Sequence, residues 1–120
     1  MKIRIRLAQA SYTATLCDSP AARDFATLLP LDLVLEDYAA TEKVSDLPRR
    51  LTTAGEPKTY EPSAGDITYY APWGNLALFH RSFSRSAGLV LLGRFDAGFD
   101  VLRRSGSLKA RIEALEDAEE

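Results

Sequence analysis

The aromatic side chains of residues 65–79 are the groups in this chain best suited to holding a ligand. Tyr69 and Tyr70 are followed by Trp73, the single tryptophan, which lies in a Pro-Trp-Gly-Asn turn between two apolar runs. Aromatic rings combine a large apolar surface with a polar atom and are favoured as binding anchors. Because successive strand residues point to opposite faces, one tyrosine is expected in the core and the other beside Trp73 in a groove. The alternative is that Trp73 folds back and seals the core.

Charged residues around Pro48 form the second candidate group. Glu42 and Arg49, with Lys43 and Arg50, come from a polar stretch that is predicted to be a loop. They have the chemistry of a polar rim on a pocket, in which Glu42 and Arg49 would contact the ligand. The alternative is a solvated cluster of ion pairs, which contributes little to stability.

Neither catalysis nor metal binding is predicted. His80 is the only histidine and Cys17 the only cysteine, and no pair of ligands has the spacing typical of a zinc site. Phosphate-binding glycine loops, nucleophile elbows and dinucleotide fingerprints are missing from the sequence. We therefore expect no catalytic residue, no metal and no cofactor. His80 is expected at a strand end on the surface, and Cys17 as a small core residue.

Size and charge narrow the class of protein. The 120 residues are expected to form one domain, and a single cysteine rules out an internal disulfide. The net charge is −2, so the basic footprint of a nucleic-acid binder is missing. The N-terminus alternates polar and apolar residues and lacks the apolar block of a signal peptide, and no run of roughly 18 apolar residues follows. These features predict a cytoplasmic protein that binds neither nucleic acid nor membrane.

Alternating polar and apolar residues predict strands over most of the chain. Residues 2–7 and 12–16 are expected to form a hairpin, and further strands are expected at 31–38, 67–71, 76–80 and 89–95. Within the last of these, Gly93 indicates a close approach of two backbones.

Helices are predicted at three places. Ser19 and Pro20 are a favourable start for a helix whose apolar stripe runs to Leu29, before Pro30. Asp96 is expected to cap a short helix that ends near Gly106. The spacing of Leu108, Ile112 and Leu115 predicts a third helix over residues 107–120, with four acidic residues in its last turn.

The order of these elements predicts a mainly β fold, a closed or nearly closed barrel with two short capping helices and a C-terminal helical tail. Residues 1–104 are assigned to the barrel domain and residues 105–120 to the acidic helical tail. The apolar stripe of the tail (Leu108, Ile112 and Leu115) has the pattern of a docking surface, so a homo-oligomer formed through the tail is one expectation.

Three segments resemble the cyclophilin fold, in particular the small bacterial cyclophilin-like proteins. The first is the N-terminal strand pair with the helix Pro20–Leu29, and the second is the hairpin Gly65–Phe79. The third, Leu89–Leu102, is similar to the strand, glycine, basic residue, turn and helix near the end of cyclophilins. The resemblance spans residues 1–104 and implies a closed cyclophilin-like barrel.

The same resemblance bears on activity. Cyclophilins are peptidyl-prolyl isomerases whose site includes an arginine on the strand after the first helix and a glutamine that holds the substrate backbone. The matching strand, Leu31–Tyr38, has no arginine, and apolar residues stand near Leu76–Ala77, where the glutamine would fall. Since a fold does not carry an activity without its site, we predict a non-catalytic module that binds a peptide or small molecule. A peptidyl-prolyl isomerase with weak activity is the alternative.

Overall fold

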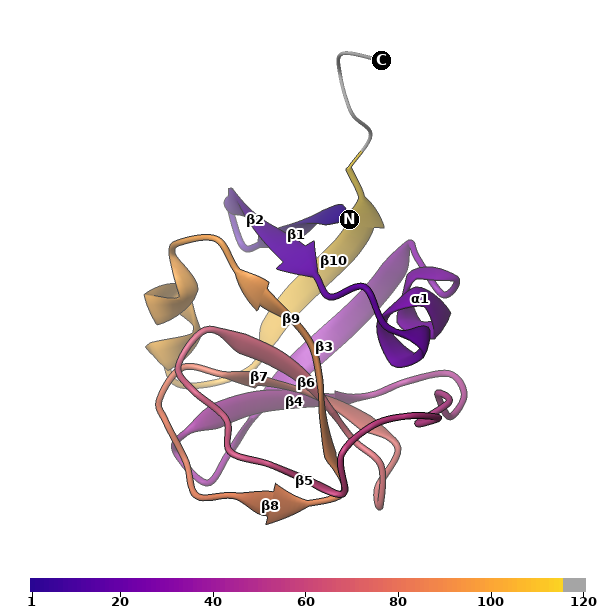
Figure 1. Cartoon of the computed structure of the whole chain (residues 1–120). Coiled ribbons are helices and arrows are strands. Elements are labelled where there is room, and N and C mark those ends of the chain that lie inside the picture. The colour runs from indigo at the N-terminus through magenta and orange to yellow at the C-terminus, as the bar shows by residue number, and fades with distance from the viewer. Residues whose placement is uncertain (116–120) are drawn as a thin grey trace.

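The chain folds into a closed antiparallel barrel of eight strands in the order β1-β10-β3-β4-β7-β6-β9-β2 (Figure 1). The computed structural model describes residues 1–115. The barrel strands are β1 (Lys2–Leu7), β2 (Ala10–Leu16), β3 (Leu31–Tyr38), β4 (Glu42–Asp46), β6 (Asp66–Tyr70), β7 (Asn75–Phe79), β9 (Leu89–Phe95) and β10 (Leu108–Ala114). Outside the barrel, β5 (Thr59–Tyr60) and β8 (Ser86–Ala87) form a two-stranded ribbon. The predicted mainly β, closed-barrel architecture is therefore confirmed.

Alternation along the strands builds the interior of the barrel. In β1, Ile3, Ile5 and Leu7 are fully buried, whereas the basic residues between them are wholly or partly exposed. Burying one such aliphatic side chain contributes about 1.5–3 kcal/mol. The close approach expected at Gly93 is also present, because a Cβ there would lie 2.4 Å from the carbonyl oxygen of Thr15. Only glycine therefore fits at this position, where β9 pairs with β2.

Helix α1 (Pro20–Ala26) covers one side of the barrel core. The Ser19 hydroxyl accepts a hydrogen bond from the backbone N–H of Ala22, as expected for an N-cap, and Phe25 is fully buried. The helix is shorter than the sequence predicts. The N–H groups of Leu28 and Leu29 donate to carbonyls three residues back, so the last turn tightens before Pro30.

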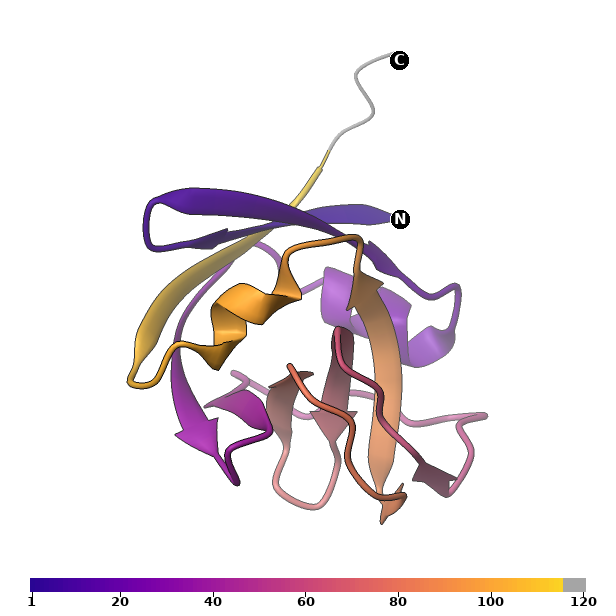
Figure 2. The same cartoon turned by 90° about the vertical axis from the view of Figure 1, so that its left-hand side faces the viewer.

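The second capping helix is the 3-10 helix η1 (Phe99–Arg103), which lies on the other side of the barrel from α1 (Figures 1 and 2). Its N-cap is Gly98, so the prediction that Asp96 caps it is wrong. The Asp96 carboxylate instead accepts hydrogen bonds from Lys2 and from Thr13 and Thr15, which lower its pKa to about 2. Among residues 1–115, no helix has the length and apolar character needed to cross a membrane.

Strand β10 occupies the place where the sequence predicts a C-terminal helix. Ile112 is fully buried and faces Ile5 of β1 on one side and Leu31 of β3 on the other. The helix prediction is wrong over Leu108–Ala114, because Leu108 and Ile112 fit both a helical stripe and a strand of period two. Pairing with the otherwise open edges of β1 and β3 selects the strand. Residues 116–120 of the predicted acidic tail lie outside the described residues.

The burial of Leu108 and Ile112 also affects the expected homo-oligomer. Both side chains pack in the barrel core, so they are not available as the docking stripe on which that expectation was based. Homo-oligomer formation itself stays a prediction.

Strand β4 is a strand where the sequence predicts a loop. Its residues, Glu-Lys-Val-Ser-Asp, have low strand propensity apart from the valine. Pairing with β3 on one side and β7 on the other overrides that local preference. The register places Glu42 opposite Phe79, and this pair forms part of the candidate site.

Replacing Ile112 by alanine tests the closing role of β10. Ile112→Ala is expected to lower the free energy of unfolding by about 2–5 kcal/mol, because it leaves a cavity beside β1 and β3. Lys109→Ala, an exposed position on the same strand, is the control, with an expected change within about 0.5 kcal/mol. Urea denaturation followed by circular dichroism measures both. Equally small effects at the two positions would contradict the assignment of β10 to the barrel.

Candidate functional site

A second apolar cluster lies on the outer face of the barrel. Ala77 and Phe79 of β7 and Leu89 of β9 are buried there, and Val44 of β4 packs against them. Strand alternation explains the placement, since the neighbours of these residues along each strand point into the core. The β5–β8 ribbon runs beside this face, below strands β4, β6 and β7 in Figure 1. The outer face is therefore partly covered and not simply solvated.

A pocket of about 230 Å³ opens in this outer face. We call it the aromatic pocket. It is lined by Tyr38, Ala39, Glu42, Val44, Tyr70, Trp73, Asn75, Phe79, Phe83, Ser86 and Leu89. Five of these side chains are aromatic, and Glu42 carries the one carboxyl group among them. The predicted residues Trp73, Tyr70 and Glu42 thus meet in one place.

Trp73 forms the outer wall of the aromatic pocket. Its ring lies 5.3 Å from that of Tyr70 and 5.5 Å from that of Tyr38, nearly perpendicular to both. The tryptophan side chain is 56% exposed. The alternative that Trp73 seals the core is therefore wrong, because the residue is exposed and its ring packs on Tyr70 and Tyr38, which line the aromatic pocket.

The two neighbouring tyrosines separate as strand alternation predicts. Tyr69 points into the core, where it is 1% exposed and its hydroxyl oxygen accepts a hydrogen bond from the N–H of Leu51. Tyr70 points outward and lines the aromatic pocket. Of the two tyrosines predicted to contact a ligand, Tyr69 is therefore part of the core, and Tyr70 is accessible from the aromatic pocket.

Glu42 lies in the wall of the pocket with its carboxyl group largely removed from water. The residue is 8% exposed, and its hydrogen bond is a long one, 3.2 Å from the hydroxyl of Thr41. No cation among the residues that the structure describes forms an ion pair with it. Burial therefore dominates and raises the pKa of Glu42 to about 7. A carboxyl group with this pKa in a concave site is a typical mark of a functional position.

Arg49 does not share the site with Glu42. Its guanidinium group pairs with Asp24 of α1 at 2.8 Å and also contacts the hydroxyl of Thr27. Arg50 donates to the carbonyl oxygen of Ala71. The predicted polar rim is therefore not formed, because β4 is a strand that carries Glu42 to the outer face, while Arg49 lies on a segment next to α1.

Lys43 is also absent from the expected rim. It directly follows Glu42 along β4, so its side chain points to the opposite face of the strand. It is fully buried, and its ammonium group pairs with Asp37 at 2.6 Å and donates to the carbonyl oxygen of Gly106. Its role is to connect β3 and β4 to the segment before β10.

Asn75, Tyr38 and Phe83 line the pocket although sequence reasoning did not select them. Asn75 is 6% exposed, and its Oδ1 atom has no hydrogen-bond partner among the described residues. Phe83 stacks on Phe79 with ring centres 6.4 Å apart. An asparagine next to a turn is too common to stand out in a sequence, and the two aromatic residues reach the pocket through pairings between distant segments.

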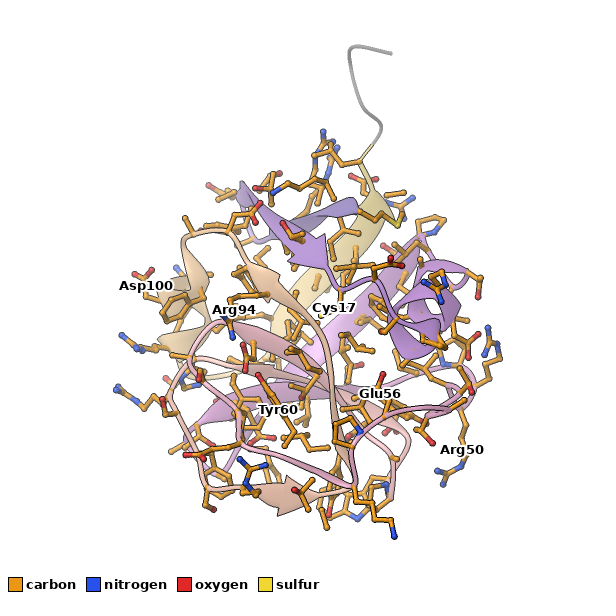
Figure 3. The ribbon with its side chains drawn as sticks, viewed as in Figure 1. Cys17, Arg50, Glu56, Tyr60, Arg94 and Asp100 are labelled. Carbon is orange, nitrogen blue, oxygen red and sulfur yellow. The ribbon has the colours of Figure 1, made fainter. Side chains whose placement is uncertain are left out.

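A buried carboxylate at the edge of the site holds the β5 segment against the barrel. Asp66, fully buried, accepts hydrogen bonds from the hydroxyl of Tyr60 at 2.7 Å and from the guanidinium group of Arg94 at 2.8 Å. Figure 3 shows Tyr60 and Arg94 converging from β5 and β9. Burial and the hydrogen bond to Asp66 raise the pKa of Tyr60 to about 12. Since Tyr60 packs on the outer apolar cluster, this contact stabilises the floor of the aromatic pocket.

His80 and Cys17 lie apart from the aromatic pocket. His80 is buried, not on the surface as predicted, and its Nδ1 atom has no partner among the described residues. Burial and then the charge of Arg81 lower its pKa. Cys17 is half-buried and packs against the core, where burial raises the pKa of its thiol. Within residues 1–115, no three histidine, cysteine or acidic side chains are placed to hold a metal ion.

The fold and the pocket together define a cyclophilin-like barrel with an aromatic site on its outer face. The chain belongs to the cyclophilin-like family, whose family model matches residues 5–113. A solved structure with the same fold is the solution structure of a hypothetical protein from Archaeoglobus fulgidus. Its TM-score is 0.69 and its identity 17%, over 96% of this chain and 95% of that chain. No curated protein matches the chain significantly. The resemblance seen in the sequence is confirmed at the level of the family.

The raised pKa of Glu42 predicts how stability depends on pH. The folded protein holds the proton with a pKa of about 7 against an ordinary value of 4.5, so folding favours the protonated form and stability falls as pH rises between these values. Relative to Glu42→Gln, the wild type is expected to lose on the order of 2 kcal/mol between about pH 5 and about pH 8. Urea denaturation at several pH values measures the difference.

Asp32→Asn is the control for that experiment, since it also removes one carboxylate but at an exposed position on the start of β3. Its pH dependence is expected to follow the wild type. A Glu42→Gln variant whose stability changes with pH as the wild type does would show that the pKa of Glu42 is the same in the folded and the unfolded protein.

Proposed function

We propose that this protein is a non-catalytic binding module that receives part of an extended peptide or a small molecule in the aromatic pocket. The observation that carries the proposal is the gathering of Trp73, Tyr38 and Phe83 at one pocket. The large hydrophobic side chains exposed among the described residues are Met1, Val34, Tyr38, Trp73 and Phe83. Three of these five line the same pocket. Such an apolar patch with a polar group inside is typical of a recognition surface.

The size of the pocket favours a small occupant. Sites for drug-sized molecules range from about 300 to 1,000 Å³. At about 230 Å³, the aromatic pocket holds one side chain or one small functional group. An extended peptide would thus place a single residue in it, and the remainder of the ligand would lie on the surface nearby. We keep a cytoplasmic location as part of the same proposal, based on the composition of the chain.

Isomerase activity remains the alternative function. The described residues that line the aromatic pocket include no arginine or glutamine, the two side chains with which cyclophilins hold the rotating amide and the substrate backbone. Aromatic and carboxyl groups are present instead. The composition of the pocket therefore supports binding over rotation of a prolyl bond.

Trp73 is a built-in reporter of binding, because it is the only tryptophan and lies at the mouth of the pocket. Titration with short peptides and with metabolites is expected to produce a saturable change in its fluorescence for at least one class. Phe83→Ala should then weaken that binding by about fivefold, since truncating a contact aromatic typically costs about 1 kcal/mol or more.

Val34→Ala is the matched control, because Val34 is equally an exposed apolar residue but lies on β3 outside the aromatic pocket. Its affinities are expected to equal those of the wild type. A fluorescence signal that no ligand class alters would contradict the proposed function.

A proline isomerisation assay addresses the alternative. With an Xaa-Pro test peptide, the isomerisation rate in the presence of the protein is expected to equal the uncatalysed rate. Uncatalysed isomerisation takes tens to hundreds of seconds at about 25 °C. A solvent-jump experiment, in which the cis population of the test peptide relaxes to its equilibrium value, measures the rate in separate samples with and without the protein. An acceleration proportional to protein concentration, and lost in Phe83→Ala, would establish the isomerase instead.

A further inference from the structure

The carboxyl group of Glu42 lies in the aromatic pocket and has no cationic partner among residues 1–115. Buried carboxylates in proteins are normally paired with a cation or with several donors, because an unpaired charge out of water is costly. Glu42 is 8% exposed and is contacted by one hydroxyl group, that of Thr41. Asp66, the fully buried aspartate of this fold, is by contrast bound by Arg94, Tyr60 and a backbone N–H. The carboxyl group of Glu42 can therefore accept hydrogen bonds from a ligand, whereas that of Asp66 is already bound within the protein.

A second acceptor lines the aromatic pocket at the other end of the β4–β7 pair. Asn75 is 6% exposed and lines the aromatic pocket, and its Oδ1 atom has no partner among the described residues. The great majority of buried hydrogen-bond acceptors in proteins have a donor partner. Glu42 lies opposite Phe79 and Asn75 opposite Asp46 in the β4–β7 register, so the two acceptors face different parts of the pocket. Glu42, which has the Thr41 hydroxyl as its one partner among the described residues, is the acceptor assigned to a donor group of the ligand.

The aromatic rings of the pocket supply ring faces to which a cation can bind. The ring planes of Trp73 and Tyr70 meet at 84° and those of Trp73 and Tyr38 at 89°. At these distances the rings are in direct edge-to-face contact, so a ligand can reach only the faces that are turned away from those contacts. The faces of tryptophan and tyrosine attract ammonium groups, and aromatic cages of this type recognise them.

We infer that the aromatic pocket binds an aliphatic primary ammonium group, with Glu42 accepting its N–H hydrogen bonds and Trp73 contacting its alkyl stem and charge. The inference rests on the proposed function and adds the chemical class of the ligand. The pocket volume of about 230 Å³ is suited to one ammonium group with a short alkyl chain. A lysine side chain of a peptide and a free alkylamine both have this chemistry.

The raised pKa of Glu42 agrees with this assignment. The value of about 7 reflects burial, which disfavours the carboxylate, and an ammonium ion is the type of group that would favour the ionised form again. Charge-assisted hydrogen bonds to such a carboxylate are stronger than neutral ones. The ligand charge would therefore offset the cost of ionising Glu42.

Two pairs of probes test the inference by titration calorimetry at about pH 8, where Glu42 with its pKa of about 7 is mostly ionised. The first pair is n-butylammonium chloride and 1-butanol, which have equal numbers of heavy atoms. The second pair is the blocked amino acids Nα-acetyl-lysine-N-methylamide and Nα-acetyl-norleucine-N-methylamide. In each pair the ammonium probe is expected to bind at least about tenfold more tightly than its neutral partner. A blocked lysine that binds more tightly than butylammonium identifies a peptide as the source, and equal affinities identify a free amine.

Variants separate charge from shape. Glu42→Gln keeps the size of the side chain and is expected to weaken binding of the ammonium probes about tenfold while the affinity for the neutral probes stays the same. Asp32→Asn, which removes an exposed carboxylate that does not line the aromatic pocket, should bind all four probes as the wild type does. Thermal unfolding of each variant checks that the fold is intact.

The outcomes distinguish the inference from the proposed function. If neutral probes bind as tightly as ammonium probes, or if Glu42→Gln keeps the preference, the ligand is not an ammonium group and the inference is overturned, while the pocket remains a binding site. If none of the four probes binds the wild type and the peptides and metabolites of the fluorescence titration also leave Trp73 unchanged, both fail.

Discussion

The pairing of β10 with β1 and β3 is the contact on which the rest of the structure depends. It joins the two open edges that the other strands would leave, so no barrel strand keeps a free edge. In a closed barrel every side chain must point either into the core or outward, and the register of each pair fixes which. The position of Glu42 opposite Phe79, on the outer face, follows from that rule and not from any local preference of β4.

The aromatic pocket is supported by this closed sheet from below and by the β5–β8 ribbon at its side. The sheet supplies Glu42, Asn75 and Tyr70 from three adjacent strands, so their spacing is set by backbone hydrogen bonds. The ribbon segment is attached to the barrel through Asp66. The pocket therefore consists of a rigid floor and an aromatic cover, and its carboxyl group carries the energetic cost of burial that a ligand would offset.

The sequence predicts those parts of the fold and site that depend on neighbours along the chain. Tyr70 and Trp73 are placed together because they lie in one hairpin, and the inward position of Tyr69 follows from alternation. Tyr38 and Phe83 could not be predicted to join them, because they reach the pocket from other segments. Glu42 and Arg49 were grouped by their proximity in sequence, yet strand pairing separates them. The sequence predicts Ile112 in a helix because residues four apart share a face in a helix and also in a strand. Only pairing with the edges of β1 and β3 decides in favour of the strand.

The partner strands β1 and β10 also have a consequence for how the protein is made. Ile5 and Ile112 are separated by about a hundred residues, and such long-range antiparallel pairings form slowly. During synthesis the N-terminal strands leave the ribosome first. In the nascent chain, β1 and β3 therefore keep unpaired edges and exposed apolar side chains until residues 108–114 have been synthesised. The order of translation leaves this chain exposed to aggregation and to chaperones over a period that is set by its topology and not by the stability of the finished barrel.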